Sequence, residues 1–231
     1  MNKDSVKWDL DSPWCIGSED YNTLTKYVDG KSPRLIVELG SGLSTFQLAN
    51  DFPEATLISL ENDPRIREQN LQTLEFNQKN SANILLAPIK LQFYKGASFI
   101  TYDFNKIKNT SQIDLLIVDG PVERLFPMGR ESSLYFLFNQ LAIGAIIGLD
   151  DYHRTSAKST VSNWLSVFGN SLLLQEETDS FAVLRKKSEC VKPKLGISLA
   201  LKSYKALTQS LLVNTRRTIS FKLRPEKNVE Q

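Results

Sequence analysis

The chain contains few of the residues from which disulfide frameworks and thiolate metal centres are built. Its 231 residues include two cysteines, Cys15 and Cys190, and one histidine, His153. The two cysteines lie far apart and lack the short spacing of metal-binding cysteines, so we expect free thiols in a reducing compartment. The N-terminal stretch also lacks the apolar core of a secretory signal, and no run approaches the roughly 18 apolar residues of a membrane-spanning helix. We therefore expect a cytoplasmic protein.

Net charge is also nearly absent, but its distribution is uneven. The formal net charge is +2 at pH 7. Residues 186–231 carry eleven Lys and Arg against three Glu, a net charge of +8, so residues 1–185 carry −6. An acidic body argues against nucleic acid as a partner, because surfaces that bind nucleic acid are basic.

The order of apolar patterns predicts the fold class. Runs typical of strands fall at 34–38, 55–60, within 83–94, at 113–120 and at 144–151, and helical patterns fall at 64–80, 131–141 and 157–168. Two further short runs, SLLLQEE and SFAVLRKK, are typical of an antiparallel hairpin at a sheet edge. This alternation predicts an α/β fold with a doubly wound, mostly parallel, Rossmann-like sheet. We expect an N-terminal helical cap at 1–33, a ligand-binding domain at 34–187 and an appended segment at 188–231.

The stretch RLIVELGSGLST, residues 34–45, carries the strongest functional signal. An apolar run, typical of a strand buried on both faces, ends in Glu38 and is followed by Gly40, Ser41 and Gly42. Glycines after such a strand allow a sharp turn and a close approach of the backbone to a nucleotide-like ligand. We expect Ser44 and Thr45 to cap a helix that begins near Phe46.

The residues around these glycines indicate which ligand the loop binds. A dinucleotide fingerprint would place a third glycine at position 45, where this chain has Thr45. An acid at Glu38 suits a cationic ligand better than a pyrophosphate, which it would repel. VELGSGLS resembles the loop of class I S-adenosylmethionine (SAM) methyltransferases, and this resemblance implies a seven-stranded sheet and SAM as the cofactor. A turn with no ligand and a nicotinamide cofactor remain alternatives.

A second acid follows the second predicted strand. ATLISLEND, residues 55–63, ends its apolar alternation at Glu61, and an acid at this place in a βαβ unit typically binds ribose hydroxyls. Asn62 and Asp63 are its neighbours. The predicted cofactor-binding residues are Glu38, Gly40, Ser41, Gly42, Ser44, Thr45, Glu61, Asn62 and Asp119.

Three aspartates end the fourth and fifth predicted strands: Asp119, Asp150 and Asp151. Carboxylates from adjacent strand ends can share a cation such as Mg²⁺, which would lower the pKa of a substrate hydroxyl. This layout resembles the metal site of cation-dependent O-methyltransferases, and it predicts Asp119, Asp150 and Asp151 as metal ligands and Asp119 and Asp150 as catalytic residues. Acidic strand ends also occur simply because carboxylates are well solvated.

The same rim carries other candidate groups. His153 follows Asp151 by two positions and is a candidate general base. Arg124, Arg130 and Arg154 are candidates to bind a carboxylate or phosphate on the acceptor, with solvated loop charges as the alternative.

Three motifs extend the resemblance to a narrower group. VDGP at 118–121, PMGR at 127–130 and LDDYHR at 149–154 are similar to motifs of the plant glucuronoxylan O-methyltransferase group and related bacterial proteins. That group pairs a VDGP loop with a PGR-type turn, in which Met128 is here an extra residue. The resemblance spans about residues 34–154 and indicates a methyltransferase more firmly than it indicates the acceptor.

The C-terminal segment predicts a basic amphipathic helix. In KLGISLALKSYKALTQSLLVNTRR, apolar residues recur at helical spacing, at Leu199, Tyr204, Leu207 and Leu211, among Lys and Arg. Such a helix can pack on its own domain, join two copies of the chain or lie on an anionic membrane. The expected location is therefore cytoplasmic or peripheral to a membrane.

Taken together, the motifs predict a SAM-dependent O-methyltransferase that acts on a hydroxyl of a small molecule or glycan, with or without a divalent cation. The alternatives are an aminopropyltransferase or another transferase of the same fold, and an inactive adaptor that binds SAM or no ligand. The sequence does not identify the acceptor.

Overall fold

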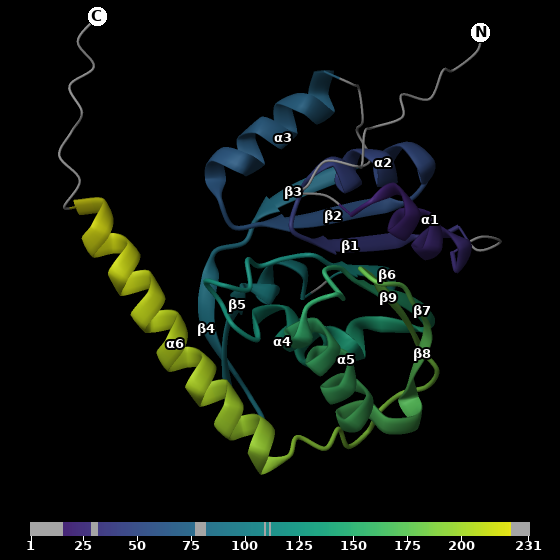
Figure 1. Ribbon diagram of the computed structural model, residues 1–231. Helices are drawn as coiled ribbons and strands as arrows, with labels where there is room; N and C mark the ends of the chain where they lie inside the picture. The colour runs from purple at the N-terminus through teal and green to yellow at the C-terminus, as the bar shows by residue number, and fades with distance from the viewer. Residues whose placement is uncertain (1–15, 29–31, 77–81, 109, 111, 223–231) are drawn as a thin grey trace, which may run out of the picture.

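The computed structural model describes residues 16–28, 32–76, 82–108, 110 and 112–222 (Figure 1). A central sheet has the strand order β3-β2-β1-β6-β7-β9-β8. Its strands are β1 (Leu35–Leu39), β2 (Thr56–Glu61), β3 (Ala82–Leu86), β6 (Ile113–Val118), β7 (Leu141–Leu149), β8 (Leu172–Glu177) and β9 (Ala182–Lys186). The first five are parallel to one another, whereas β9 pairs antiparallel with both β7 and β8. The predicted seven-stranded, mostly parallel sheet with an antiparallel edge hairpin is confirmed.

Helices cover both faces of this sheet because its central strands are apolar on both sides. In β1, Leu35, Val37 and Leu39 face one hydrophobic core, and Ile36 faces the other. The first core includes residues of α4 (Gly129–Leu137) and α5 (Thr155–Phe168), and the second includes residues of α1 (Ser18–Lys26) and α2 (Leu43–Asp51). This arrangement is the doubly wound packing that continuous apolar strands require.

Several elements depart from the expected boundaries, most clearly the third strand and α2. The segment 83–94 contains the end of β3 and also β4 (Ile89–Tyr94), which forms a separate antiparallel pair with β5 (Ala97–Tyr102). α2 begins at Leu43, with Gly42 as its N-cap, so the expected helix start near Phe46 was wrong. Thr45 does help to cap the helix, because its Oγ1 accepts a hydrogen bond from the Gly42 N–H. Ser44 and Thr45 both lie within the first turn, where they bind another group described below.

The remaining helices add to this arrangement. α3 (Pro64–Phe76) packs on β2 and β3. It corresponds to the helix predicted at 64–80. Short 3₁₀ helices occur at Phe104–Ile107, Phe138–Gln140 and Gly169–Ser171. The long C-terminal helix α6 (Ile197–Lys222) runs along one flank of the molecule and packs on β5 (Figure 1). Within the described residues, no helix is both long and apolar enough to cross a membrane.

Candidate functional site

The loop after β1 lies at the carboxyl edge of the sheet. Gly40 adopts a left-handed φ of 99°, and a Cβ built on it would lie 3.2 Å from the backbone nitrogen of Gly120. The loops that follow β1 and β6 are therefore packed backbone to backbone, and a side chain at position 40 would strain this contact. The glycine predicted to allow the turn is confirmed in that role.

Gly42 differs from Gly40, because the protein itself does not require it to be a glycine. Its backbone is extended, and a Cβ built on it would meet no atom of the described residues within 4 Å. Its N–H donates to Thr45 Oγ1 at 3.0 Å at the start of α2. The space in front of Gly42 is open on the side where a helix N-terminus and a strand end meet, which is where ligands bind in open α/β sheets.

Glu38 of β1 fixes the start of α2, directly after this loop, through hydrogen bonds. It is fully buried, and its two carboxylate oxygens accept hydrogen bonds of 2.5 Å from Ser44 Oγ and Thr45 Oγ1. Burial raises the pKa of Glu38 to about 7, although these hydrogen bonds act in the opposite direction. The first turn of α2 is thus fixed to β1 by two hydroxyls. In the structure Glu38 positions the loop, and its direct contact with a ligand stays a prediction.

Glu61 holds the same loop from the neighbouring strand. Its Oε2 accepts hydrogen bonds from the N–H and Oγ of Ser41, at 3.3 and 3.1 Å. Its Oε1 accepts from the backbone N–H groups of Asn62 and Asp63, at 2.7 and 2.8 Å. Asn70 of α3 donates to Ser41 Oγ at 2.9 Å, which fixes the Ser41 side chain further. The structure thus brings the predicted glycine loop and the predicted acid at the end of β2 into contact.

Three aspartates converge at the ends of β6 and β7, as the sequence predicted. One carboxylate oxygen from each of Asp119, Asp150 and Asp151 lies within 4.8 Å of the other two. Arg130, from the first turn of α4, pairs with two of them: Nη2 lies 3.1 Å from Asp119 Oδ1, and Nη1 lies 2.6 Å from Asp151 Oδ2. Nη1 of Arg130 also donates to the backbone oxygen of Asp150 at 3.5 Å. The Arg130 side chain is only 11% exposed, so these pairs are shielded from water.

The predicted Mg²⁺ site stays a prediction, because the three aspartates lie close enough to share an ion but arginines bind two of them in the structure. A divalent ion needs carboxylate oxygens that are free to coordinate it. Asp119 and Asp151 instead bind the Arg130 guanidinium, and Arg154 Nη2 lies 2.9 Å from the second oxygen of Asp151. The positive charge among the aspartates comes from arginine. Arg130 and Arg154, predicted to bind the acceptor, are paired with these aspartates in the structure.

Burial raises the pKa values of two of these aspartates. Burial, together with the charge of Asp119 and a hydrogen bond to it, raises the pKa of Asp150 to about 8. Burial likewise raises the pKa of Asp119, against the lowering effect of Arg130. Two neighbouring carboxyl groups that share one proton have such raised pKa values. Asp150 is therefore a group that can accept a proton near neutral pH.

His153 and Arg124 lie farther out than the sequence suggested. His153 is exposed on the turn after β7 and makes no hydrogen bond or ion pair with the described part of the chain. Arg124 is exposed on the loop after β6. Both remain on the rim of the candidate site, and their roles as base and as acceptor ligand stay predictions.

Tyr102 is a site residue that the sequence analysis missed. It ends β5 and is buried, and a side chain on Gly120 would collide with its hydroxyl. Burial and the nearby charges of Glu61 and Asp119 raise the pKa of Tyr102, so it stays neutral. Its signal in the sequence is the strand pattern of 97–102.

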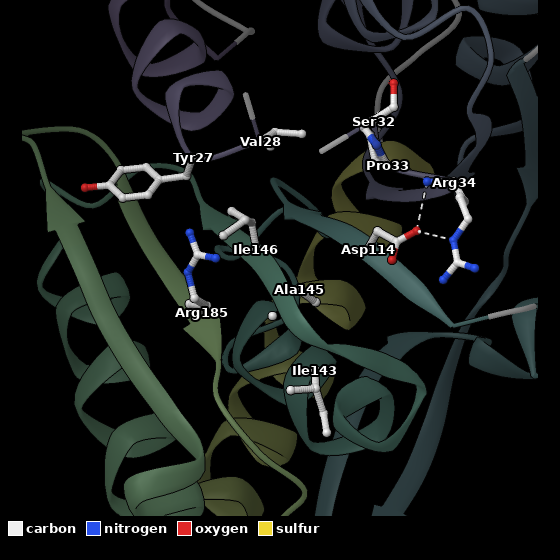
Figure 2. Close-up of a pocket in the computed structure, with 11 residues that line it drawn as sticks. Tyr27, Val28, Ser32, Pro33, Arg34, Asp114, Ile143, Ala145, Ile146 and Arg185 are labelled. Atoms are coloured by element: carbon white, nitrogen blue, oxygen red, sulfur yellow. Dashed lines mark hydrogen bonds and ion pairs between the residues drawn. The ribbon is translucent and has the colours of Figure 1, made fainter. Parts of the chain in front are cut away.

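A cavity of about 240 Å³ lies at the opposite edge of the sheet (Figure 2). It is lined by Tyr27, Arg34, Asp114, Ile143 and Arg185, among others, near the first residues of β1, β6 and β7. Within it, the Arg34 backbone donates to Asp114 Oδ2 at 2.8 Å. Ligands of open α/β sheets bind at the carboxyl ends of the strands, so this cavity is separate from the candidate site.

No family model and no curated protein sequence matches this chain. Solved structures do match it in fold. The cofactor-bound protein Rv0187 from MTB superposes with a TM-score of 0.58 at 15% identity, over 77% of this chain and 84% of that chain. The O-methyltransferase from Bacillus cereus in complex with SAH gives 0.57 at 13% identity, over 76% and 84%. Precorrin-6y C5,15-methyltransferase from Geobacter metallireducens gives 0.55 at 12% identity, over 77% and 92%. In fold, the chain therefore resembles the class I SAM-dependent methyltransferases, as the motif after its first strand predicted.

Proposed function

We propose that the protein is a SAM-dependent methyltransferase. The observation that carries this proposal is the loop at Gly40–Gly42, which is held by Glu38 and Glu61 and faces open space at the carboxyl edge of the sheet. Acidic groups surround this edge, and they favour a ligand with cationic sulfonium and amino groups over an anionic one. Comparison structures of the same fold include a methyltransferase with SAH, which supports the same ligand.

For the reaction we propose transfer to a hydroxyl of a small molecule or glycan. SAM supplies an electrophilic methyl group, and most of the protein's contribution is to hold the acceptor oxygen in line with it. The new oxygen–carbon bond forms as the methyl–sulfur bond of SAM breaks and SAH leaves. The Asp150 carboxylate takes the hydroxyl proton in this step, because its raised pKa makes it basic enough near neutral pH. Arg130 orients Asp119 and Asp151 and keeps their negative charges compensated. We assign the exposed Arg124 to an anionic group of the acceptor.

The glycine at position 42 provides the sharpest test of the cofactor. In Gly42→Val, the new side chain enters the space that we assign to SAM, without a clash with the protein and without a left-handed φ. We expect SAM affinity to fall at least about tenfold in calorimetric titration, because the ligand and the side chain would overlap, while the melting temperature changes little.

Gly196→Val is the matched control. Like Gly42, Gly196 precedes a helix, has open space among the described residues where its Cβ would be and needs no left-handed φ. Unlike Gly42, it precedes α6 and is not part of the loop at 40–42. It should bind SAM like the unaltered protein. Equal SAM affinity in both variants, or no SAM binding by the unaltered protein, would contradict the proposed cofactor.

A further inference from the structure

α6 has two different faces, and its inner face packs against the rest of the protein. Leu199, Ser203, Ala206 and Ser210 are buried and recur every three or four residues along one side. Ser203 Oγ accepts a hydrogen bond of 3.0 Å from the backbone N–H of Ser98 in β5. This inner face is made largely of small and polar residues. Of the apolar residues expected to form one face, Leu199 is buried and Leu207 half-buried, whereas Tyr204 and Leu211 are exposed.

Hydrogen bonds also fix the rotation of the helix. Ser210 Oγ and Asn214 Nδ2 both donate to the backbone oxygen of Leu125, at 2.7 and 3.2 Å. Leu125 belongs to the loop after β6, so α6 is fastened to the domain at its middle as well as near its start. The helix therefore cannot turn to bury its outer face against the domain without breaking these contacts.

The outer face is an apolar stripe, although it is exposed. Its residues follow one another at helical spacing and are Ile197, Leu201, Tyr204, Leu211 and Leu212. Their exposed fractions run from 46% at Tyr204 to 82% at Ile197. A helix that packs one face on its own domain normally exposes polar residues on the other. Contiguous exposed apolar side chains are typical of surfaces that bind another body.

The charged side chains that α6 itself carries beside this stripe are all positive in its described part. Lys202, Lys205 and Arg216 are exposed along the helix. Between Glu189 and Glu226 the sequence contains eight Lys and Arg and no acidic residue. A second copy of the chain is a poor partner for this face, because two such helices would bring like charges together. A partner with a dense, continuous negative charge and an apolar interior fits both properties.

We propose that the outer stripe of α6 docks the protein on an anionic lipid bilayer, with the helix lying along the surface. The apolar side chains enter the boundary between headgroups and acyl chains, and the lysines face the anionic headgroups. The length suits this orientation, since 26 helical residues extend over about 39 Å and offer the stripe several turns of contact.

Vesicle sedimentation of the full chain tests this proposal. The protein should sediment with vesicles of phosphatidylcholine that contain about 30% phosphatidylglycerol, and it should not sediment with vesicles of phosphatidylcholine alone. Binding should weaken at least about tenfold as salt rises from low ionic strength to about 0.5 M, because exposed charges are screened. Failure to sediment with the anionic vesicles at low salt would overturn the proposal, as would equal binding to both kinds of vesicle.

A pair of variants distinguishes binding through this stripe from non-specific binding through any exposed apolar residue. Leu201→Ser with Leu212→Ser removes two stripe residues that are exposed and so leaves folding intact, as an unchanged melting temperature would show. This variant should bind anionic vesicles at least about tenfold more weakly, because two apolar side chains no longer enter the bilayer. Ile143→Ser with Leu173→Ser changes two exposed apolar residues on β7 and β8 and should bind normally. Equal losses in both variants would overturn the proposal. So would a dimer in solution that only the α6 variant dissociates, since the stripe would then bind a second copy.

Discussion

The Arg130 guanidinium pairs with two of the three aspartates around it. Without a cation, three carboxylates within 4.8 Å would repel one another strongly. The sequence analysis met this problem with a divalent ion, but the structure meets it with one buried arginine and a shared proton on Asp119 and Asp150. The chemical consequence is that Asp150 keeps a raised pKa, which a bound divalent ion would lower.

Methyl transfer should therefore depend on pH and survive chelation. Because Asp150 must be ionised to accept a proton, kcat/KM should rise with pH and level off above about 8, the pKa of Asp150. Asp150→Asn should lower kcat about 100-fold or more and leave SAM affinity nearly unchanged, since general-base catalysis typically contributes this much. EDTA should leave the activity of the unaltered enzyme in place.

Two results would contradict this account. Activity that disappears on chelation and returns with Mg²⁺ would restore the metal-assisted mechanism. A pH profile that is unaltered in Asp150→Asn but lost in His153→Ala would assign the base to His153.

At the scale of elements, a buried acid links α4 to α5. Glu131, in the first turn of α4, is 3% exposed and accepts hydrogen bonds from Tyr135 Oη at 2.6 Å and Asn163 Nδ2 at 3.1 Å. Trp164 Nε1 of α5 donates to the backbone oxygen of Glu131 at 2.7 Å. Burial raises the pKa of Glu131 from 4.5 to about 7, although its hydrogen bonds act in the opposite direction.

Stability should therefore fall as the pH rises. The folded chain holds the Glu131 proton more tightly than the unfolded chain, so this group stabilises the fold below pH 4.5 and loses that contribution as the pH rises to about 7. The loss is at most about 3 kcal/mol for a shift of this size. Glu131→Gln cannot titrate, so urea denaturation should show a smaller fall in its free energy of unfolding between pH 5 and pH 8. Glu75→Gln, at an exposed position on α3, is the control and should keep the full fall. An identical fall in both variants would contradict the link.

The predictability of each element followed from how local its determinants are. The sequence predicts β1 and β6 because a short, continuous apolar run next to an acid is typical of a buried strand. It predicts the role of Gly40 because the turn after β1 needs a residue in the left-handed conformation. The β4–β5 hairpin also had a local signal, since Lys95 and Gly96, both at positive φ, join two strand patterns. We did not use that signal. The ion pairs of Arg130 had none, because they depend on how the loop after β6 folds back over β7.

At the scale of the whole molecule, the acidic and basic parts of the sequence form different parts of the structure. The acidic body contains the sheet and the candidate site, and the basic segment forms α6 on its flank (Figure 1). The sequence predicted the helix and its alternative contacts, but it could not tell which face packs inward. That choice depends on small residues such as Ser203 and Ala206, which fit against β5 where leucines would not.

Removal of α6 should therefore loosen one side of the site without removing the cofactor loop. A chain that ends at residue 195 loses the burial of Leu199 and Ala206 and the hydrogen bonds from Ser210 and Asn214 to Leu125. We expect the free energy of unfolding to fall by about 2–4 kcal/mol from these losses. Amide hydrogens of 97–102 and 121–128 should exchange faster, because both segments contact α6, whereas SAM affinity should stay within about twofold, since the loop at 40–42 has its own supports. A chain that ends at residue 222 keeps α6 and should match the full chain in each measurement. Unchanged exchange at 97–102 in the shorter chain would mean that the inner face of α6 does not hold β5 in place.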